Sequence, residues 1–234
     1  MSKYKLDFET PLVVSTNLVS IFNVSGFDKQ REKAVRNQKN SGFVDASFEA
    51  MMKAVGWKSG QAWCAYFMKL CLMQMFSFDR EFLAKNFTAS AYGNLLVFQN
   101  LNKKGEKRYL ALSDNNYQVG DVVCMKNPSD SYGHTFMIVD VLGKNNDGSV
   151  SVTTLEGNTS LKGSREGEGA FNLKRTLKIG SLSGGQVVKG YIRRVFTPEE
   201  VKSLAYDNNN NTFVFTNATP TKQTSSIFFP PKFK

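Results

Sequence analysis

Histidine, cysteine and long apolar runs are all scarce in this chain of 234 residues. His134 is the single histidine, which excludes every zinc site that needs two or more histidines. The three cysteines, Cys64, Cys71 and Cys124, cannot form a disulfide framework, and at least one thiol is left free. No run approaches the ~18 apolar residues that a transmembrane helix needs. We therefore expect no transmembrane segment.

The first residues also lack the pattern of a signal peptide. Lys3 and Lys5 are followed at once by Asp7 and Glu9, and polar residues interrupt the apolar stretch at 12–22. If the protein acts outside the cytosol, we expect another component to deliver it.

Basic residues outnumber acidic ones, 30 to 20, which gives a formal net charge of +10. Such a surplus favours polyanionic surroundings, for example nucleic acid, anionic lipid or an acidic wall polymer. The basic clusters are spread along the chain, and no zinc-finger, RNP-type or Gly-x-x-Gly signature accompanies them. A nucleic-acid-binding protein is thus an alternative that rests on basicity alone, and we expect no specific nucleic acid partner.

The pattern of apolar residues changes near Asn100, from helical spacing to short β-rich segments. This order predicts an α+β fold with N-terminal helices packed on an antiparallel β-sheet. The expected helices cover 28–39, 43–55, 60–76, 90–101 and a short turn from 197, and the expected strands cover 122–125, 135–141, 149–155, 171–177 and 187–196. We expect an N-terminal arm at 1–27, a catalytic domain at 28–206 and a polar tail at 207–234.

Four residues form a candidate site. Cys64 lies near the start of the apolar helix, where the helix dipole and free N–H groups favour a thiolate. His134 lies at the mouth of a strand, and Glu156 and Asn158, two residues apart at the end of the next strand, are expected on one face. Each has a structural explanation when taken alone, as a core cysteine, a strand-capping histidine and a β-turn. Together they follow the order of nucleophile, histidine and polar orienting residue of papain-like enzymes.

Five segments in register carry a family resemblance: GQAWCAYF, GDVVCM, GHTFMIV, LEGNTS and VVKGYIRRV. Between about residues 30 and 196 the chain resembles the cysteine, histidine-dependent amidohydrolase/peptidase (CHAP) family of phage and bacterial wall-lytic proteins. The resemblance implies a papain-like CHAP fold.

The resemblance also implies a role for each site residue. Cys64 becomes the nucleophile, His134 the general base and acid, Glu156 the residue that orients the imidazole, and Asn158 a supporting polar residue. The Cys64 backbone N–H is expected in the oxyanion hole, with Gln61 as a side-chain donor. Thr135 and Phe136 stand where smaller residues are frequent in the family, and we expect them to narrow the cleft.

The implied reaction is amide hydrolysis through a thioester, with no metal or cofactor. The implied substrate is peptidoglycan, cut by an endopeptidase or an N-acetylmuramoyl-L-alanine amidase. The resemblance further implies a phage-encoded protein, either a lysin in the host cytoplasm that a holin releases or a virion-associated hydrolase with virion proteins as partners. The main alternative is a structural virion component whose CHAP domain has little or no activity.

Overall fold

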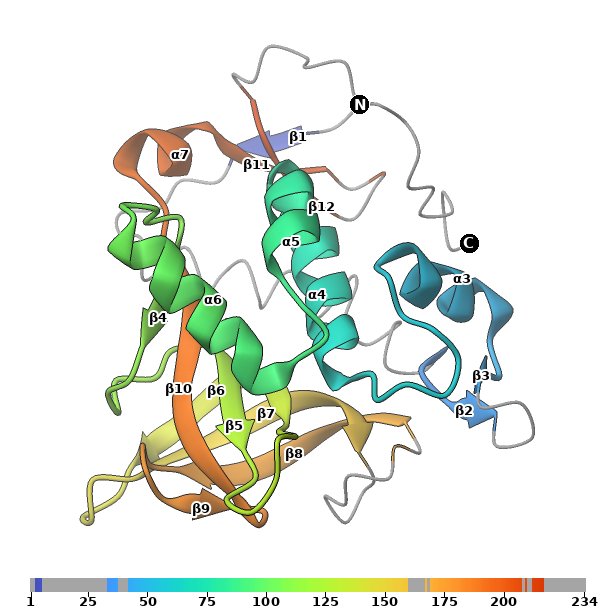
Figure 1. The fold of residues 1–234 in the computed structure, drawn as a ribbon. Helices are drawn as coiled ribbons and strands as arrows, with labels where there is room; N and C mark the ends of the chain where they lie inside the picture. Colours follow the sequence, from blue (N-terminus) through green and yellow to red (C-terminus); the bar gives the residue numbers. More distant parts are fainter. Residues whose placement is uncertain are drawn as a thin grey trace.

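The β-rich second half of the chain forms a seven-stranded antiparallel sheet, along which the helices of the first half are packed (Figure 1). The computed structural model describes residues 3–5, 33–37, 42–159, 167, 169–207, 209 and 212–216. The strand order is β4-β10-β5-β6-β7-β8, and β9 pairs with β10. The strands are β4 (Tyr109–Leu112), β5 (Val122–Lys126), β6 (Thr135–Lys144), β7 (Val150–Thr159), β8 (Gly169–Leu177), β9 (Leu182–Ser183) and β10 (Gln186–Arg194). The predicted α+β fold class is confirmed.

The helices follow local sequence signals. The described helices are α3 (Ala46–Ala54), α4 (Cys64–Met75), the 3-10 turn η2 (Ser77–Asp79), α5 (Arg80–Asn86), α6 (Ala91–Lys103) and α7 (Pro198–Ser203). Asp45, Ser90 and Thr197 cap α3, α6 and α7 by accepting a backbone N–H, and Thr197 with Glu200 forms a capping box. The apolar α4 is buried nearly all round, as its sequence predicts, because it contacts β6 and β7 on one side and other helices on the other.

Strand alternation divides the buried side chains between two faces of the sheet. Val122 and Cys124 of β5 join the core beneath the helices, whereas Val123 and Met125 join a second apolar cluster on the opposite face. Phe136, fully buried in β6, also belongs to this second cluster. The sheet is thus buried on both faces, so the side chains on either face can form a water-excluded environment.

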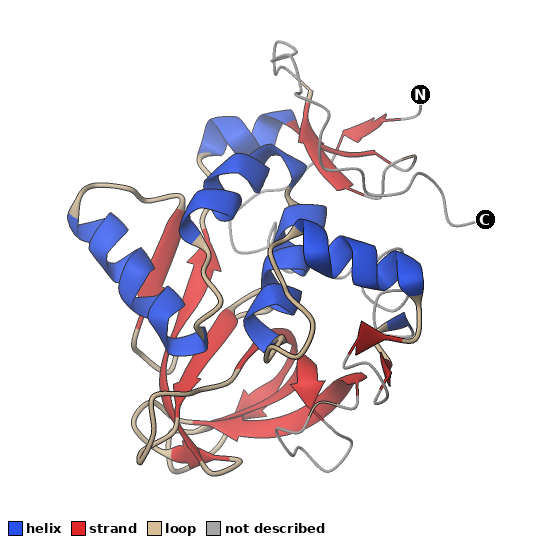
Figure 2. Cartoon of the chain, turned by 45° about the vertical axis from the view of Figure 1, so that its right-hand side comes forward, coloured by secondary structure: helices blue, strands red, loops and turns tan. Residues whose placement is uncertain are grey.

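The packed region extends beyond residue 206, where the sequence predicted the domain to end. A second, three-stranded sheet joins β1 (Lys3–Lys5), β11 (Leu204–Asp207) and β12 (Thr212–Phe215) at the upper edge of the molecule (Figure 2). Phe213 is fully buried, and Phe215 stacks on Phe78 with ring centroids 4.1 Å apart. Residues 212–216 therefore pack on the body, and residues 3–5 pair with β11. Apart from Asp207 and Asn209, the rest of the expected arm and tail lies outside the described residues.

Another prediction differs from the structure near residue 36. Instead of continuing a helix over 28–39, Arg36–Asn37 form the short strand β2, paired with β3 (Gly42–Phe43). The guanidinium of Arg36 lies 5.4 Å from the ring centroid of Phe43 and 5.7 Å from that of Trp57. These tertiary contacts favour an extended backbone over the local helix propensity. Residues 28–32 and 38–39 lie outside the described part.

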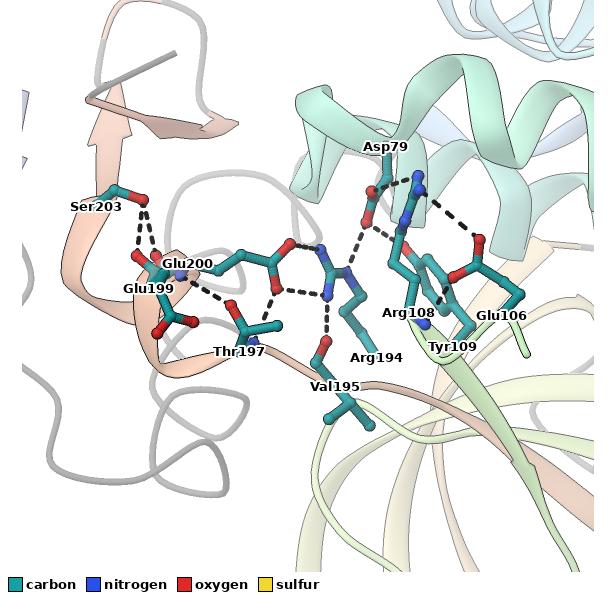
Figure 3. A network of polar contacts seen from close by, with 10 residues as sticks. All are labelled: Asp79, Glu106, Arg108, Tyr109, Arg194, Val195, Thr197, Glu199, Glu200 and Ser203. Atoms are coloured by element: carbon teal, nitrogen blue, oxygen red, sulfur yellow. Dashed lines mark hydrogen bonds and ion pairs between the residues drawn. The ribbon is translucent and has the colours of Figure 1, made fainter. Parts of the chain in front are cut away.

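A buried polar network joins the helices to the end of the sheet (Figure 3). Asp79 accepts hydrogen bonds from Arg194 Nε at 2.7 Å and from the Tyr109 hydroxyl at 3.0 Å. Arg194 also donates to Glu200 of α7 at 2.9 Å. The network therefore ties η2, β4, β10 and the capping box of α7 together.

Candidate active site

Cys64 is the first residue of α4, and its side chain faces β6. No side chain caps this helix end at Trp63. The Cys64 side chain is buried, with 6% of the residue exposed, and its sulfur accepts hydrogen bonds from the backbone N–H groups of Ala65 and Thr135. A sulfur that receives backbone N–H groups at the positive end of a helix is favoured in its ionised form.

His134 immediately precedes β6 and faces both Cys64 and Glu156. Its Nε2 lies 2.9 Å from Glu156 Oε2, so Nδ1 is the ring nitrogen left for the hydrogen bond with the Cys64 thiol. Gly133 makes this position possible, because a Cβ there would lie 2.0 Å from the carbonyl oxygen of Met125 in β5. Gly133 thus lets the segment before β6 approach the backbone of β5 closely.

Gly157 brings the β7 end of the site against α4. A Cβ at this position would lie 2.6 Å from the Phe67 ring and 2.7 Å from the Trp63 ring. Only glycine fits without a shift of these fully buried rings. The glycine of LEGNTS thus lets the Glu156 segment lie close to the start of the Cys64 helix.

Glu156 is fully buried and its carboxylate receives hydrogen bonds from three side chains. His134 contacts Oε2, Thr154 Oγ1 donates to Oε1 at 2.6 Å, and Arg175 of β8 donates from Nη2 to Oε2 at 2.7 Å and from Nε to Oε1. A buried carboxylate requires such partners, since desolvation otherwise favours its neutral form.

The electrostatics of these groups favour a chain of alternating charges. Burial raises the pKa of the Cys64 thiol, but the hydrogen bond and charge of His134, with two backbone N–H groups, outweigh burial and hold that pKa below its usual value. Burial also disfavours the His134 cation, yet the hydrogen bonds and charges of Cys64 and Glu156 raise its pKa to about 9. Against burial, Arg175 and His134 lower the pKa of Glu156 to about 2. Thiolate, imidazolium, carboxylate and guanidinium then follow one another with no net charge.

The other two thiols lie in different environments. All three cysteines are free and buried. Cys71, two turns along α4, has its pKa raised by burial, and burial raises the pKa of Cys124 in β5 to about 12. Neither has an imidazole partner, so neutral thiols are expected at both positions.

Asn158 and Gln61 are not among the described hydrogen-bond partners of His134 and Glu156. Asn158 has a positive φ of 60°, at a shift of register between β7 and β8, so simple strand alternation does not carry its side chain to the face of Glu156. The side-chain oxygen of Gln61 accepts hydrogen bonds from the backbone N–H of Lys58 and from the Tyr66 hydroxyl. Gln61 thus closes the loop that precedes α4.

Thr135 and Phe136 do not narrow a cleft, because both are fully buried. The Thr135 hydroxyl donates to the carbonyl oxygen of Val123 at 2.7 Å, and its backbone N–H contacts the Cys64 sulfur. Phe136 lies 5.9 Å from the His134 ring, measured between centroids. The two residues therefore lie in the core beside the site and do not line its surface.

Sequence reasoning missed Arg175 and Thr154. Arg175 was one of several basic residues in a strand, and its register partner on β7 is Val152, not Glu156. Glu156 lies opposite Phe171, four residues before Arg175 on β8, so the contact depends on the length of the arginine side chain. Thr154 precedes Glu156 by two residues, which is the one local signal that could have indicated its hydrogen bond.

Two other kinds of feature are absent from the described ranges. No group of three or more His, Cys, Asp or Glu residues there could hold a metal ion. Within the same ranges no helix combines the length and apolar character needed to cross a membrane.

A cysteine at a helix start, facing a histidine and a carboxylate from adjacent strands, is the arrangement of papain-like thiol hydrolases. Residues 56–158 match the family model of the CHAP domain, so this part of the chain is a CHAP domain. No curated protein and no solved structure gave a significant match. A CHAP domain indicates a peptidoglycan hydrolase of the amidase or peptidase type that acts on the cell wall.

Proposed function

We propose that Cys64, His134 and Glu156 hydrolyse an amide bond of peptidoglycan through a thioester. The observation that carries this proposal is the continuous hydrogen-bonded chain from Cys64 through His134 to Glu156. The lowered pKa of the thiol and the raised pKa of the imidazole support an ion pair that is ready for nucleophilic attack.

In the first half of the reaction, the Cys64 thiolate attacks the amide carbonyl carbon. The proposed oxyanion hole is formed by the backbone N–H of Cys64, which donates to the oxygen on which negative charge develops. The side-chain amide of Gln61 is the proposed second donor. The His134 cation gives its proton to the leaving amine, and the C–N bond breaks. The acyl group stays on Cys64 as a thioester.

In the second half, neutral His134 takes a proton from water, and the resulting hydroxide equivalent attacks the thioester. Collapse of the intermediate releases the carboxylic acid and returns the thiolate beside the imidazolium. Glu156 accepts from Nε2 in both halves and so keeps Nδ1 directed at the sulfur and the substrate. Asn158 has a positive φ, and a Cβ added to Gly167 would lie 2.2 Å from the side-chain oxygen of Asn158. We propose that Asn158 supports the geometry of the Glu156 segment.

We further propose that the protein is phage-encoded, as a lysin released from the host cytoplasm or as a virion-associated hydrolase that contacts virion proteins. The resemblance to phage wall-lytic proteins supports this origin. The net charge of +10 suits a wall rich in carboxylate or phosphate groups. Endopeptidase and amidase reactions both proceed by attack on an amide carbonyl, so the same site serves either.

Digestion of defined peptidoglycan followed by mass analysis of the fragments tests activity and identifies the bond together. We expect wild type to release fragments that differ by one hydrolysed amide, and Cys64→Ala to release none. Equal digestion by both proteins contradicts the assignment of Cys64. No digestion by the folded wild type favours the alternative of a structural virion component with little activity.

A further inference from the structure

Arg175 binds the same carboxylate as His134. Its Nη2 donates to Glu156 Oε2 at 2.7 Å and its Nε donates to Oε1, so the guanidinium binds both carboxylate oxygens. Paired contacts of this kind fix the plane of a carboxylate as well as its charge. Arg175 lies in β8, beyond residues 56–158 that match the family model.

The guanidinium is itself held in place. Its central carbon lies 5.0 Å from the ring centroid of Phe136, and the Arg175 side chain is only 9% exposed. On another side, a Cβ added to Gly184 would lie 2.7 Å from Arg175 Nη1. A long side chain with an aromatic ring beneath it and backbone beside it has little freedom to leave the carboxylate.

We propose that Arg175 is a positioning residue, which orients the Glu156 carboxylate toward His134 and balances its charge in the buried site. The inference rests on the proposed function, because it assigns a role to the group behind Glu156. Thr154 contributes the remaining side-chain donor to the same carboxylate.

The role has a consequence for the pH dependence of the site. Among the described residues, the charged groups that face Glu156 are Arg175 from β8 and His134, which precedes β6. His134 in turn faces Cys64 of α4. Without Arg175, burial favours the protonated form of Glu156. A neutral Glu156 stabilises the His134 cation less, so the thiolate of Cys64 forms only at higher pH.

The test is the rate of Cys64 alkylation by iodoacetamide as a function of pH, measured on the full chain, together with kcat and KM on soluble muropeptides. For Arg175→Met we expect the acid limb of both profiles to move upward by about one pH unit or more. We expect kcat to fall about tenfold or more while KM changes less than about twofold, because the Arg175 side chain is only 9% exposed and binds Glu156. Arg175→Lys keeps the charge but loses the paired contact, so its acid limb should lie between those of wild type and Arg175→Met.

Two matched controls separate this role from charge and from stability. Lys174→Met makes the same change at the neighbouring exposed position of β8 and should leave the profile unchanged. Arg193→Met breaks another buried pair of the same sheet, in which Arg193 donates to both oxygens of Asp121 at 2.7 Å. It should lower the melting temperature without moving the acid limb.

A folded Arg175→Met protein with the wild-type acid limb overturns the proposal. If Arg175→Met does not fold, an Arg175→Lys profile identical to that of wild type overturns it equally. A wild-type protein whose Cys64 is unreactive below pH 9 contradicts the proposed function instead, so the two failures are distinguishable.

Discussion

Two buried carboxylates, Glu156 and Asp79, make the most informative comparison in this protein. They are 0% and 2% exposed, and each accepts hydrogen bonds from an arginine and from a hydroxyl group. Their pKa values nevertheless shift in opposite directions. Burial dominates at Asp79 and raises its pKa, whereas hydrogen bonds from Arg175 and His134 outweigh burial at Glu156 and lower its pKa to about 2.

The difference lies in what each arginine and each network contacts. Arg175 binds both oxygens of Glu156, but Arg194 divides its donors between Asp79 and Glu200 (Figure 3). The Glu156 network continues through an imidazole to a thiol, and both can exchange a proton near neutral pH. The Asp79 network ends at a helix cap. A buried ion pair is therefore no sign of a functional site until it includes a group that titrates in the working range.

The largest expected effect is at the thiol. Cys64→Ala should lower the rate of peptidoglycan hydrolysis by about 10³-fold or more, because no other group can form the thioester. Cys71→Ala is the matched control on the same helix. It should keep the activity of each folded molecule within about twofold, although it opens a small cavity. Comparable losses in the two variants would contradict the distinction between these thiols.

The next effect compares the two carboxylates directly. Glu156→Gln should lower kcat by about 10²-fold, because the amide stabilises the His134 cation less. Asp79→Asn should cost about 3 kcal/mol of unfolding free energy by leaving Arg194 short of a partner, with kcat of the folded fraction nearly unchanged. Urea unfolding and initial rates measure both quantities. A loss of kcat in Asp79→Asn similar to that in Glu156→Gln would contradict the assignment of a catalytic role to Glu156 and a structural role to Asp79.

A third effect concerns the strand beyond the expected domain end. Phe213→Ala should lower the unfolding free energy by about 3 kcal/mol, since this ring is fully buried in the core. Phe215→Ala, at a half-buried ring, should cost less. Thermal melting of both variants checks that Phe213→Ala is the less stable of the two. A wild-type melting temperature in Phe213→Ala would mean that the core ends at residue 206.

A smaller effect is expected from pH. Hydrolysis should fall about tenfold per pH unit above about 9, where His134 loses its proton and can no longer protonate the leaving amine. For stability, the His134 cation contributes fully below its ordinary pKa of 6.5 and the contribution is lost as the pH rises through about 9. Glu156 contributes above 4.5, and its contribution is lost as the pH falls through about 2.

The pH dependence of hydrolysis by wild type, and the urea midpoints of wild type and His134→Gln as a function of pH, measure these effects. The stability difference between the two proteins should be largest below pH 6.5 and should shrink as the pH rises through about 9. A difference that grows over this range would mean that His134 is neutral in the folded protein.

Local signals were sufficient for much of this molecule. The positions of Cys64 at a helix start, His134 before a strand and Glu156 at the end of the next strand all followed from short motifs and turn residues. The helix starts expected at residues 90 and 197 were equally local, and Ser90 and Thr197 cap these helices. These features depend on neighbours within about four residues in the sequence, which is the range that pattern reasoning covers.

What the sequence did not indicate depends on distant partners. Arg175 reaches Glu156 from across the β7–β8 pair, 19 residues away, and Arg36 is extended because of aromatic rings that lie further along the chain. Phe213 is buried because its strand pairs with β11 and packs near Phe76. In each case tertiary packing decides the outcome over local propensity.

Limited alkylation with iodoacetamide near neutral pH, followed by peptide mapping, shows directly whether Cys64 is an ionised nucleophile activated by His134. Cys64 should be labelled first, activity should fall in step with this single adduct, and His134→Ala should slow the labelling. Cys71 and Cys124 should stay unlabelled in the folded protein because burial raises both of their pKa values. Labelling of Cys71 or Cys124 before Cys64, or equal Cys64 labelling in wild type and His134→Ala, would contradict this role of Cys64.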